Sequence, residues 1–137
     1  MLDHLALSVP PDKFQATVDF YVASLAPLGY EKLVSMFDDK LIALGNKSSP
    51  MSNKADFWLS GMSEANVDKN YAHWAFVAED HSKVDAFYAN ALQAGGRDNG
   101  APGLRPHFGP HYYAAFVIDP MGNNVEVVCR KDREGQP

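Results

Sequence analysis

The sequence predicts an α+β fold in which two tandem β-α-β-β-β modules follow one another along the 137 residues. Self-similarity is the first observation behind this prediction, because His4–Val9 and His73–Ala78 each begin with histidine and continue apolar, 73 − 4 = 69 positions apart. A second match follows, where the aromatic pairs Phe20-Tyr21 and Phe87-Tyr88 are displaced by 88 − 21 = 67 positions. Two copies are too few for a solenoid, so each module is expected to bury one face against the other.

The third observation is the pattern within each expected strand and helix. His4–Val9 alternates bulky apolar residues with small or polar ones, as a half-buried strand does, and His73–Ala78 repeats this alternation. A helix is expected after each strand, because Pro10-Pro11-Asp12 and Asp80 provide helix-start signals. Glycine closes both helices, and their apolar residues share one face that can cover a sheet.

Further strands complete each module. The first module is expected to continue with strands over Tyr30–Met36, Leu41–Gly45 and Ala55–Ser60. In the second, the Gly/Pro-rich segment Arg97–Gly109 predicts only a short strand and a long loop. A hairpin is then expected from Tyr112–Ile118 and Asn124–Arg130.

These elements are expected to form a single domain. Module one covers about residues 1–68, module two about 69–130, and a flexible tail follows over 131–137. Since no linker separates the modules, their sheets are expected to share one cavity.

Composition excludes several classes of function. Twelve Lys and Arg against seventeen Asp and Glu give a net charge of -5 without a basic cluster, so a nucleic-acid partner is not expected. No segment has the length of a membrane span or the pattern of a signal peptide, and the single Cys129 cannot form an intramolecular disulfide. We therefore expect a cytoplasmic protein that binds a small-molecule substrate, without a nucleic-acid or membrane partner.

Two histidines and one late carboxylate form the candidate metal site. Glu126 lies among valines of the last strand, where a carboxylate is costly to bury without a cation or hydrogen-bond donors. His4 and His73 take equivalent positions on the small-residue faces of their strands, so a pseudo-twofold pairing of the modules would bring their imidazoles together. Two imidazoles and one carboxylate suit a divalent ion of Fe, Mn, Zn, Co or Ni, with coordination positions left for substrate and water.

The repeat also locates the position of a fourth ligand. Subtracting 68 from 126 gives Trp58, and tryptophan does not bind metal. If the alignment is shifted by two, Asp56 or Ser60 would take the same strand face, and Asp56 is the only substitute ligand that this strand offers.

With these residues in place, the chain resembles the vicinal oxygen chelate superfamily, which includes glyoxalases, bleomycin-resistance proteins and extradiol dioxygenases. The resemblance spans nearly the whole chain and includes the pattern Asp-Pro-x-Gly-x-x-x-Glu, matched by Asp119, Pro120, Gly122 and Glu126. It implies a glyoxalase-like domain whose paired modules form a half-open barrel around a metal ion. Glyoxalase I and methylmalonyl-CoA epimerase have Glu or Gln where this chain has Trp58. The chain is therefore more similar to the three-ligand extradiol dioxygenases and fosfomycin-resistance thiol transferases.

The resemblance implies a metal-dependent enzyme that acts on a small substrate through two vicinal oxygens, with Glu126 leaving the metal to act as a base. Lyase or isomerase, dioxygenase and thiol-transfer chemistry all remain open. The residues expected to contact the substrate are Trp58, Arg105, His107 and Tyr112. Tyr112 is preferred to Tyr113 because it shares strand parity with Ala114 and Phe116.

Two alternatives are left open. The first is a non-catalytic small-molecule binder that resembles bleomycin-resistance proteins, with the same cavity holding a planar ligand. The second concerns assembly, because the superfamily often builds its site across a homodimer. His4 would then come from one subunit and His73 with Glu126 from the other, whereas an intramolecular site takes all three from one chain.

Overall fold

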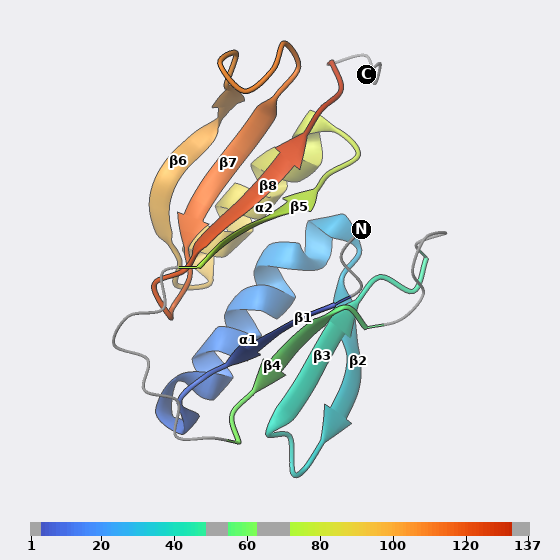
Figure 1. Ribbon diagram of the computed structural model, residues 1–137, viewed down its shortest axis with the longest axis vertical. Helices are drawn as coiled ribbons and strands as arrows, with labels where there is room; N and C mark the ends of the chain where they lie inside the picture. The colour runs from blue at the N-terminus through green and yellow to red at the C-terminus, as the bar shows by residue number, and fades with distance from the viewer. Residues whose placement is uncertain (1–3, 49–54, 63–71, 133–137) are drawn as a thin grey trace.

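Two four-stranded mixed sheets dominate the computed structural model, which describes residues 4–48, 55–62 and 72–132 (Figure 1). The first module consists of β1 (Leu5–Ser8), α1 (Pro11–Leu25), the short 3-10 helix η1 (Ala26–Leu28), β2 (Glu31–Met36), β3 (Leu41–Gly45) and β4 (Phe57–Ser60). The second consists of β5 (His73–Val77), α2 (His81–Gln93), β6 (Arg97–Leu104), β7 (Tyr113–Ile118) and β8 (Asn124–Cys129). The strand orders β1-β4-β3-β2 and β5-β8-β7-β6 are equivalent, which confirms two tandem βαβββ modules.

The expected boundary between the modules, near residues 68 and 69, lies outside the described residues, as does the tail beyond Asp132. The single-domain assignment with those limits therefore stays a prediction. Within the described ranges, no helix is both long and apolar enough to cross a membrane.

Local sequence signals set the ends of both helices as expected. Pro11 occupies the first turn of α1, where its missing N–H has no intrahelical partner to lose. Asp80 caps α2, because its side chain accepts a hydrogen bond of 3.0 Å from the backbone N–H of Lys83. Gly29 and Gly95 follow the helical segments with φ angles of 80° and 98°, a left-handed conformation that favours glycine.

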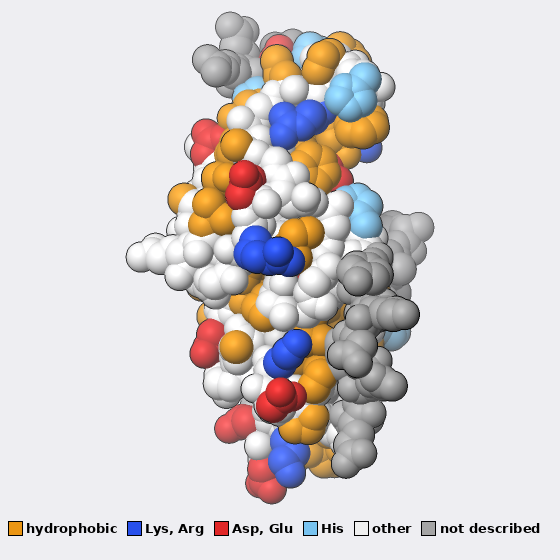
Figure 2. Space-filling view, turned by 90° about the vertical axis from the view of Figure 1, so that its left-hand side faces the viewer, with side chains coloured by type: hydrophobic (Ala, Val, Ile, Leu, Met, Phe, Trp, Pro, Cys, Tyr) orange, Lys and Arg blue, Asp and Glu red, His pale blue; other side chains and the backbone are white. Residues whose placement is uncertain are grey.

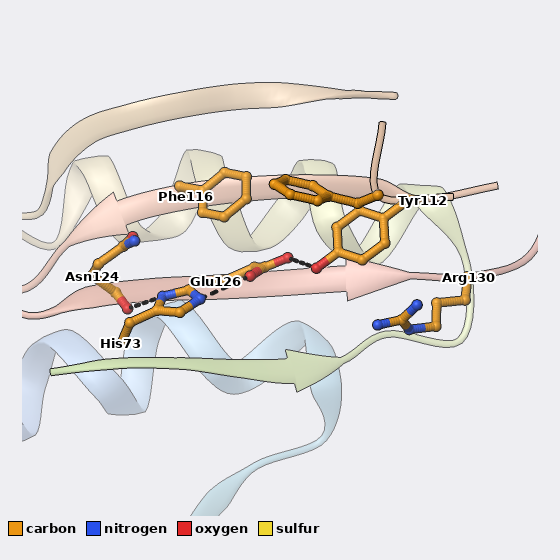
Figure 3. A pocket seen from close by; sticks show the side chains of 7 residues that line it. His73, Tyr112, Phe116, Asn124, Glu126 and Arg130 are labelled. Atoms are coloured by element: carbon orange, nitrogen blue, oxygen red, sulfur yellow. Dashed lines mark hydrogen bonds and ion pairs between the residues drawn. The ribbon is translucent and has the colours of Figure 1, made fainter. Parts of the chain in front are cut away.

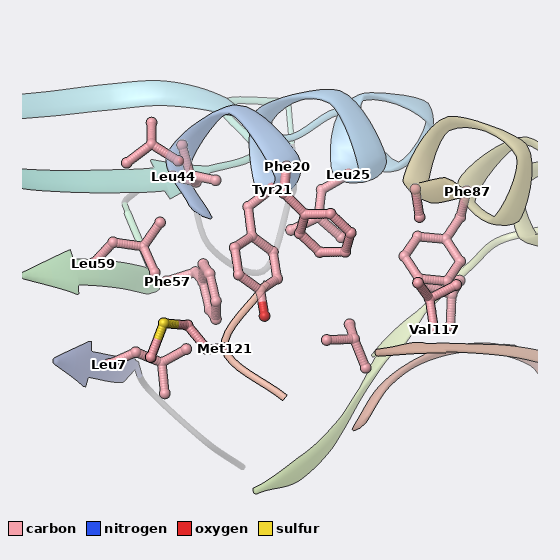
Figure 4. Packing of buried hydrophobic residues seen from close by; sticks show 14 of the residues in the cluster. Leu7, Phe20, Tyr21, Leu25, Leu44, Phe57, Leu59, Phe87, Val117 and Met121 are labelled. Atoms are coloured by element: carbon pink, nitrogen blue, oxygen red, sulfur yellow. The ribbon is translucent and has the colours of Figure 1, made fainter. Parts of the chain in front are cut away.

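One hydrophobic core joins the two modules. The ring of Tyr21 in α1 lies 4.7 Å from that of Phe57 in β4 and 6.3 Å from that of Trp74 in β5. Figure 4 shows Phe20 on the same helix directed toward Phe87 of α2. Because aromatic side chains of both modules interleave, the packing of α1 fixes how one sheet sits against the other.

The prediction of only a short strand in Arg97–Gly109 is wrong, because β6 runs for eight residues, Arg97–Leu104. Its pairing with β7 is interrupted by two register shifts, one between Asp98 and Gly100 and one between Gly100 and Gly103. Pro102 falls inside the second shift, where the absence of an N–H removes no ladder hydrogen bond. β6 is also an edge strand, so a sequence rich in Gly and Pro is accommodated there.

Candidate metal and ligand site

His73 and Glu126 lie side by side on the open face of the second sheet, away from α2. β5 and β8 pair in parallel, with His73 opposite Asn124 and Ala75 opposite Glu126. The imidazole Nε2 of His73 is 3.3 Å from Oε2 of Glu126 (Figure 3). Two of the three predicted metal ligands are therefore adjacent.

The carboxylate of Glu126 is buried, with only 3% of the residue exposed. Its second oxygen, Oε1, accepts a hydrogen bond of 2.5 Å from the hydroxyl of Tyr112. Burial and the neighbouring Glu126 carboxylate both raise the pKa of Tyr112, so its hydroxyl keeps the proton that it donates. The two oxygens of Glu126 thus face different partners, a phenol and an imidazole.

The backbone fixes which nitrogen of His73 faces the carboxylate. Nδ1 lies 3.0 Å from the carbonyl oxygen of Asn124, and a carbonyl oxygen can only accept, so Nδ1 carries the hydrogen. In the neutral imidazole, Nε2 is then a lone-pair acceptor that faces another acceptor, Oε2 of Glu126. Such a pair is satisfied when a proton or a metal ion lies between the two atoms.

The donor set fits a divalent metal ion. Typical bonds from zinc to histidine nitrogen and to carboxylate oxygen are about 2.0–2.2 Å, so two atoms 3.3 Å apart can both bind one ion. The hydrogen bond from Nδ1 of His73 to the Asn124 carbonyl is the usual outer contact of a ligating histidine. His73 and Glu126 therefore have the chemistry and spacing of two metal ligands.

A cavity of about 450 Å³ opens beside this pair. Its walls are formed by His73, Phe108, Tyr112, Phe116, Asn124, Glu126 and Arg130. His73, Tyr112 and Glu126 were predicted site residues, whereas the other four were not. Strand alternation could have indicated Asn124 and Arg130, because both share parity with Glu126 along β8 and the residue that follows it.

The other predicted substrate contacts do not form part of this wall. The guanidinium of Arg105 lies 5.6 Å from the ring centre of Phe116 and donates a 2.8 Å hydrogen bond to the carbonyl of Ala101. His107 is exposed, with its ring 4.1 Å from that of Phe108. Arg105 and His107 therefore contact residues of the cavity wall without being part of it. Their contact with substrate, like that of Trp58, stays a prediction.

Trp58 occupies the position in the first sheet that Glu126 occupies in the second. β1 pairs with β4 in parallel so that Ala6 lies opposite Trp58, just as Ala75 lies opposite Glu126. The register therefore supports the alignment made from the internal repeat. The position equivalent to Glu126 holds an indole in place of a carboxylate.

His4 does not join His73 and Glu126 within one chain. In the described ranges there is no group of three His, Cys, Asp or Glu side chains that could hold a metal ion. Figure 1 gives the reason, since β1 and β5 begin at opposite ends of the region where the two sheets meet. The cavity at His73 is lined by the second module alone, which differs from the single shared cavity expected from the sequence. The full ligand set of His4, His73 and Glu126 stays a prediction.

Comparisons with known proteins agree with this architecture. No protein-family model matches the chain, and no curated protein matches it either. Among solved structures, a glyoxalase/bleomycin resistance protein from Albidiferax ferrireducens T118 has a TM-score of 0.67 at 23% identity, over 93% of this chain and 96% of that one. A glyoxalase/bleomycin resistance protein/dioxygenase family enzyme from Burkholderia phytofirmans PsJN has a TM-score of 0.65 at 18% identity, over 93% of this chain and 97% of that one.

A further similar structure is the lactoylglutathione lyase of Agrobacterium tumefaciens, with a TM-score of 0.60 at 20% identity, over 94% of this chain and 92% of that one. The chain therefore has the fold of the glyoxalase/bleomycin resistance/dioxygenase proteins. This confirms the fold that the sequence resemblance implied. Activity is a separate question, because one fold of this kind can hold many sites.

Proposed function

We propose that this chain is a divalent-metal-dependent enzyme that acts on a small oxygen-bearing substrate. The observation that carries the proposal is the approach of Nε2 of His73 to Oε2 of Glu126 at 3.3 Å, with the hydrogen of the imidazole on Nδ1. Two acceptors in this arrangement are satisfied by a proton or a metal ion between them, and a metal ion that binds both would also compensate the buried carboxylate.

We infer that the third ligand, His4, comes from a second copy of the chain. His4 precedes β1 as His73 begins β5, yet the two strands begin at opposite ends of the region where the two sheets meet. A homodimer in which the first module of one copy faces the second module of the other would bring the two histidines to one site. Val77, which lies on the same face of β5 as His73, is 78% exposed and would become covered in such an assembly.

When bound, the metal would supply Lewis-acid polarisation of the substrate oxygens. Glu126 would act as the base, because it combines burial with a neighbour on each oxygen. Tyr112 would hold Oε1 of Glu126 and so leave Oε2 directed at the ion and the substrate. Lyase, isomerase, dioxygenase and thiol-transfer chemistry would all use polarised oxygens at such a site.

Elemental analysis of the purified protein tests the metal site. Wild type is expected to retain a divalent ion, and His73→Ala is expected to lose it. His111→Ala is a matched control, because this histidine is absent from the walls of the cavity beside Glu126. Equal metal contents in wild type and His73→Ala would refute the proposed ligand.

Mixed dimers test the sharing of the site. His4→Ala and Glu126→Ala chains with different tags are coexpressed, and the heterodimer is isolated through both tags. A shared site predicts that one of its two sites regains all three ligands, so metal binding returns to about half of the wild-type level. An intramolecular site predicts no recovery.

A second candidate function is metal-free binding of a planar ligand. The three aromatic rings of Phe108, Tyr112 and Phe116 in the cavity wall favour it, because they offer flat apolar surfaces to such a ligand. This candidate predicts negligible metal in wild type and in His73→Ala alike.

A further inference from the structure

Arg130 provides a cation at the end of the cavity away from His73. It directly follows β8 and shares strand parity with Glu126 and Val128. Arg130 lies four positions after Glu126 along this extended segment, which corresponds to about 13 Å between their Cα atoms. In Figure 3 the side chain of Arg130 extends back along β8, so the guanidinium and the His73–Glu126 pair lie at two ends of one cavity.

The guanidinium of Arg130 stacks on an aromatic ring and has no acidic partner among the described residues. Its carbon Cζ lies 4.8 Å from the ring centre of Tyr112. The nearby carboxylate of Glu126 is instead engaged by Tyr112 and His73. The N–H groups of the planar Arg130 guanidinium can therefore donate to an anion that enters the cavity.

Aromatic rings form most of the apolar wall between these two ends. Phe116 stacks near His73, with ring centres 6.4 Å apart, and Phe108 packs on Tyr112 at 5.3 Å. Phe108 is also 57% exposed, so its aromatic ring is accessible to a ligand in the cavity. Figure 2 shows hydrophobic, histidine and basic side chains together at the end of the molecule formed by the second module. A flat ring would cover these apolar surfaces by stacking.

We propose that the cavity binds a planar aromatic carboxylate, with its ring against Phe108, Tyr112 and Phe116 and its carboxylate on Arg130. A volume of about 450 Å³ accommodates a ligand of this size. A carboxylate matches the fork of one guanidinium by two parallel hydrogen bonds. The inference rests on the proposed function in one respect, since it places the aromatic acid in the cavity assigned to the substrate.

Calorimetric titration of the full chain with three probes tests the inference. Benzoate carries both features, benzamide lacks the charge, and cyclohexanecarboxylate lacks the aromatic ring. Benzoate is expected to bind about tenfold more tightly than benzamide, the size of effect typical of a charge-assisted pair. It is also expected to bind severalfold more tightly than cyclohexanecarboxylate, because only the flat ring can stack on the aromatic wall. Titrations are made on protein as purified and after EDTA treatment, so the preference for benzoate is measured independently of the metal.

Variants of Arg130 then assign the preference to its side chain. Arg130→Gln is expected to bind benzoate and benzamide equally, with benzamide binding unchanged from wild type. Arg130→Lys, which keeps the charge without the fork, is expected to retain part of the preference. Arg97→Gln removes one positive charge from an exposed residue outside the cavity wall and is expected to behave as wild type.

Three results would overturn the inference. These are an undiminished preference for benzoate in Arg130→Gln, equal binding of cyclohexanecarboxylate and benzoate, and competition by inorganic phosphate as strong as that by benzoate. The proposed metal site is tested separately, by the metal content of His73→Ala. If that test fails, the benzoate measurements still decide whether the cavity binds an aromatic carboxylate.

Discussion

The hydroxyl of Tyr21 in α1 donates a 2.5 Å hydrogen bond to Oδ2 of Asp119, in the turn between β7 and β8. Asp119 is 3% exposed, and its other oxygen accepts backbone hydrogen bonds from Met121 and Asn123, each of 2.8 Å. This carboxylate therefore organises the turn that leads into the strand of Glu126, and Tyr21 ties that turn to the first module.

Tyr21→Phe is expected to lower the free energy of unfolding by about 1–3 kcal/mol, because it removes a donor from a buried carboxylate while keeping the ring. Urea denaturation of wild type and variant measures the difference. Tyr88→Phe is the matched control, since this tyrosine is also helical and has a carboxylate, Asp98, near its hydroxyl but little burial around it. It should change stability by less than about 0.5 kcal/mol. Equal losses in the two variants would contradict the importance of the buried bond.

The contribution of Tyr21 should also depend on pH. Burial, and then the charge and hydrogen bond of Asp119, raise the pKa of Tyr21 well above its ordinary value of 10.0. A group whose pKa is raised by folding stabilises the protein fully below its unfolded pKa and loses that contribution as pH rises toward the folded one. The stability gap between wild type and Tyr21→Phe should therefore be smaller at about pH 10.5 than at about pH 8.

Trp58→Glu is expected to strengthen metal binding, because it restores a carboxylate at the position equivalent to Glu126. With His4 supplied by the same sheet, the shared site would gain a fourth ligand and an affinity higher by at least about tenfold. Competition with a chelator measures the change. Trp58→Phe, which removes the indole without adding a ligand, should leave the affinity unchanged. An unaltered affinity in Trp58→Glu would argue against a site that includes the first sheet.

Tyr112→Phe is expected to weaken metal binding by about 10–100-fold, the usual effect of removing a partner that orients a ligand. Without the phenol, Oε1 of Glu126 loses its hydrogen bond and the carboxylate is free to turn. Tyr113→Phe is the control, because the hydroxyl of Tyr113 bonds instead to Asp85 of α2. If both variants keep wild-type affinity, Tyr112 does not position the ligand.

Much of the fold was predictable because it depends on local patterns and on the repeat. The equivalence of Trp58 and Glu126 is an example, since a shift of 68 residues found a pair that the strand register supports. Strand parity with Phe116 also favoured Tyr112 over Tyr113 as a residue of the cavity, and both Tyr112 and Phe116 line it. Both relationships follow from periodicity, either between the two repeats or along one strand.

The remaining features depend on contacts between distant segments. The length of β6 was underestimated, because its bulges form only through pairing with β7. The separation of His4 from His73 follows from how the modules meet, which is set by packing among Tyr21, Phe57 and Trp74. No periodicity in the sequence specifies that contact, so the histidines could be assigned to equivalent strands but not to one point in space.

The packing between modules can be tested at Gly96, which follows α2. A Cβ atom at this position would lie 2.5 Å from Cγ1 of Val117, 2.7 Å from Cε2 of Phe20 and 2.8 Å from the carbonyl oxygen of Ala91. Because one of these neighbours is backbone and the other two are buried, Gly96→Ala should destabilise the protein by about 1–3 kcal/mol or more.

Gly103→Ala is the matched control for this substitution. Its Cβ would approach the flexible end of Arg105 at 3.0 Å, and a side chain in that position can move aside. Gly103→Ala should therefore change the free energy of unfolding by no more than about 0.5 kcal/mol. Urea denaturation of wild type and both variants measures these free energies of unfolding. A Gly96→Ala protein as stable as Gly103→Ala would mean that α2 and β7 do not approach α1 as closely as the core requires.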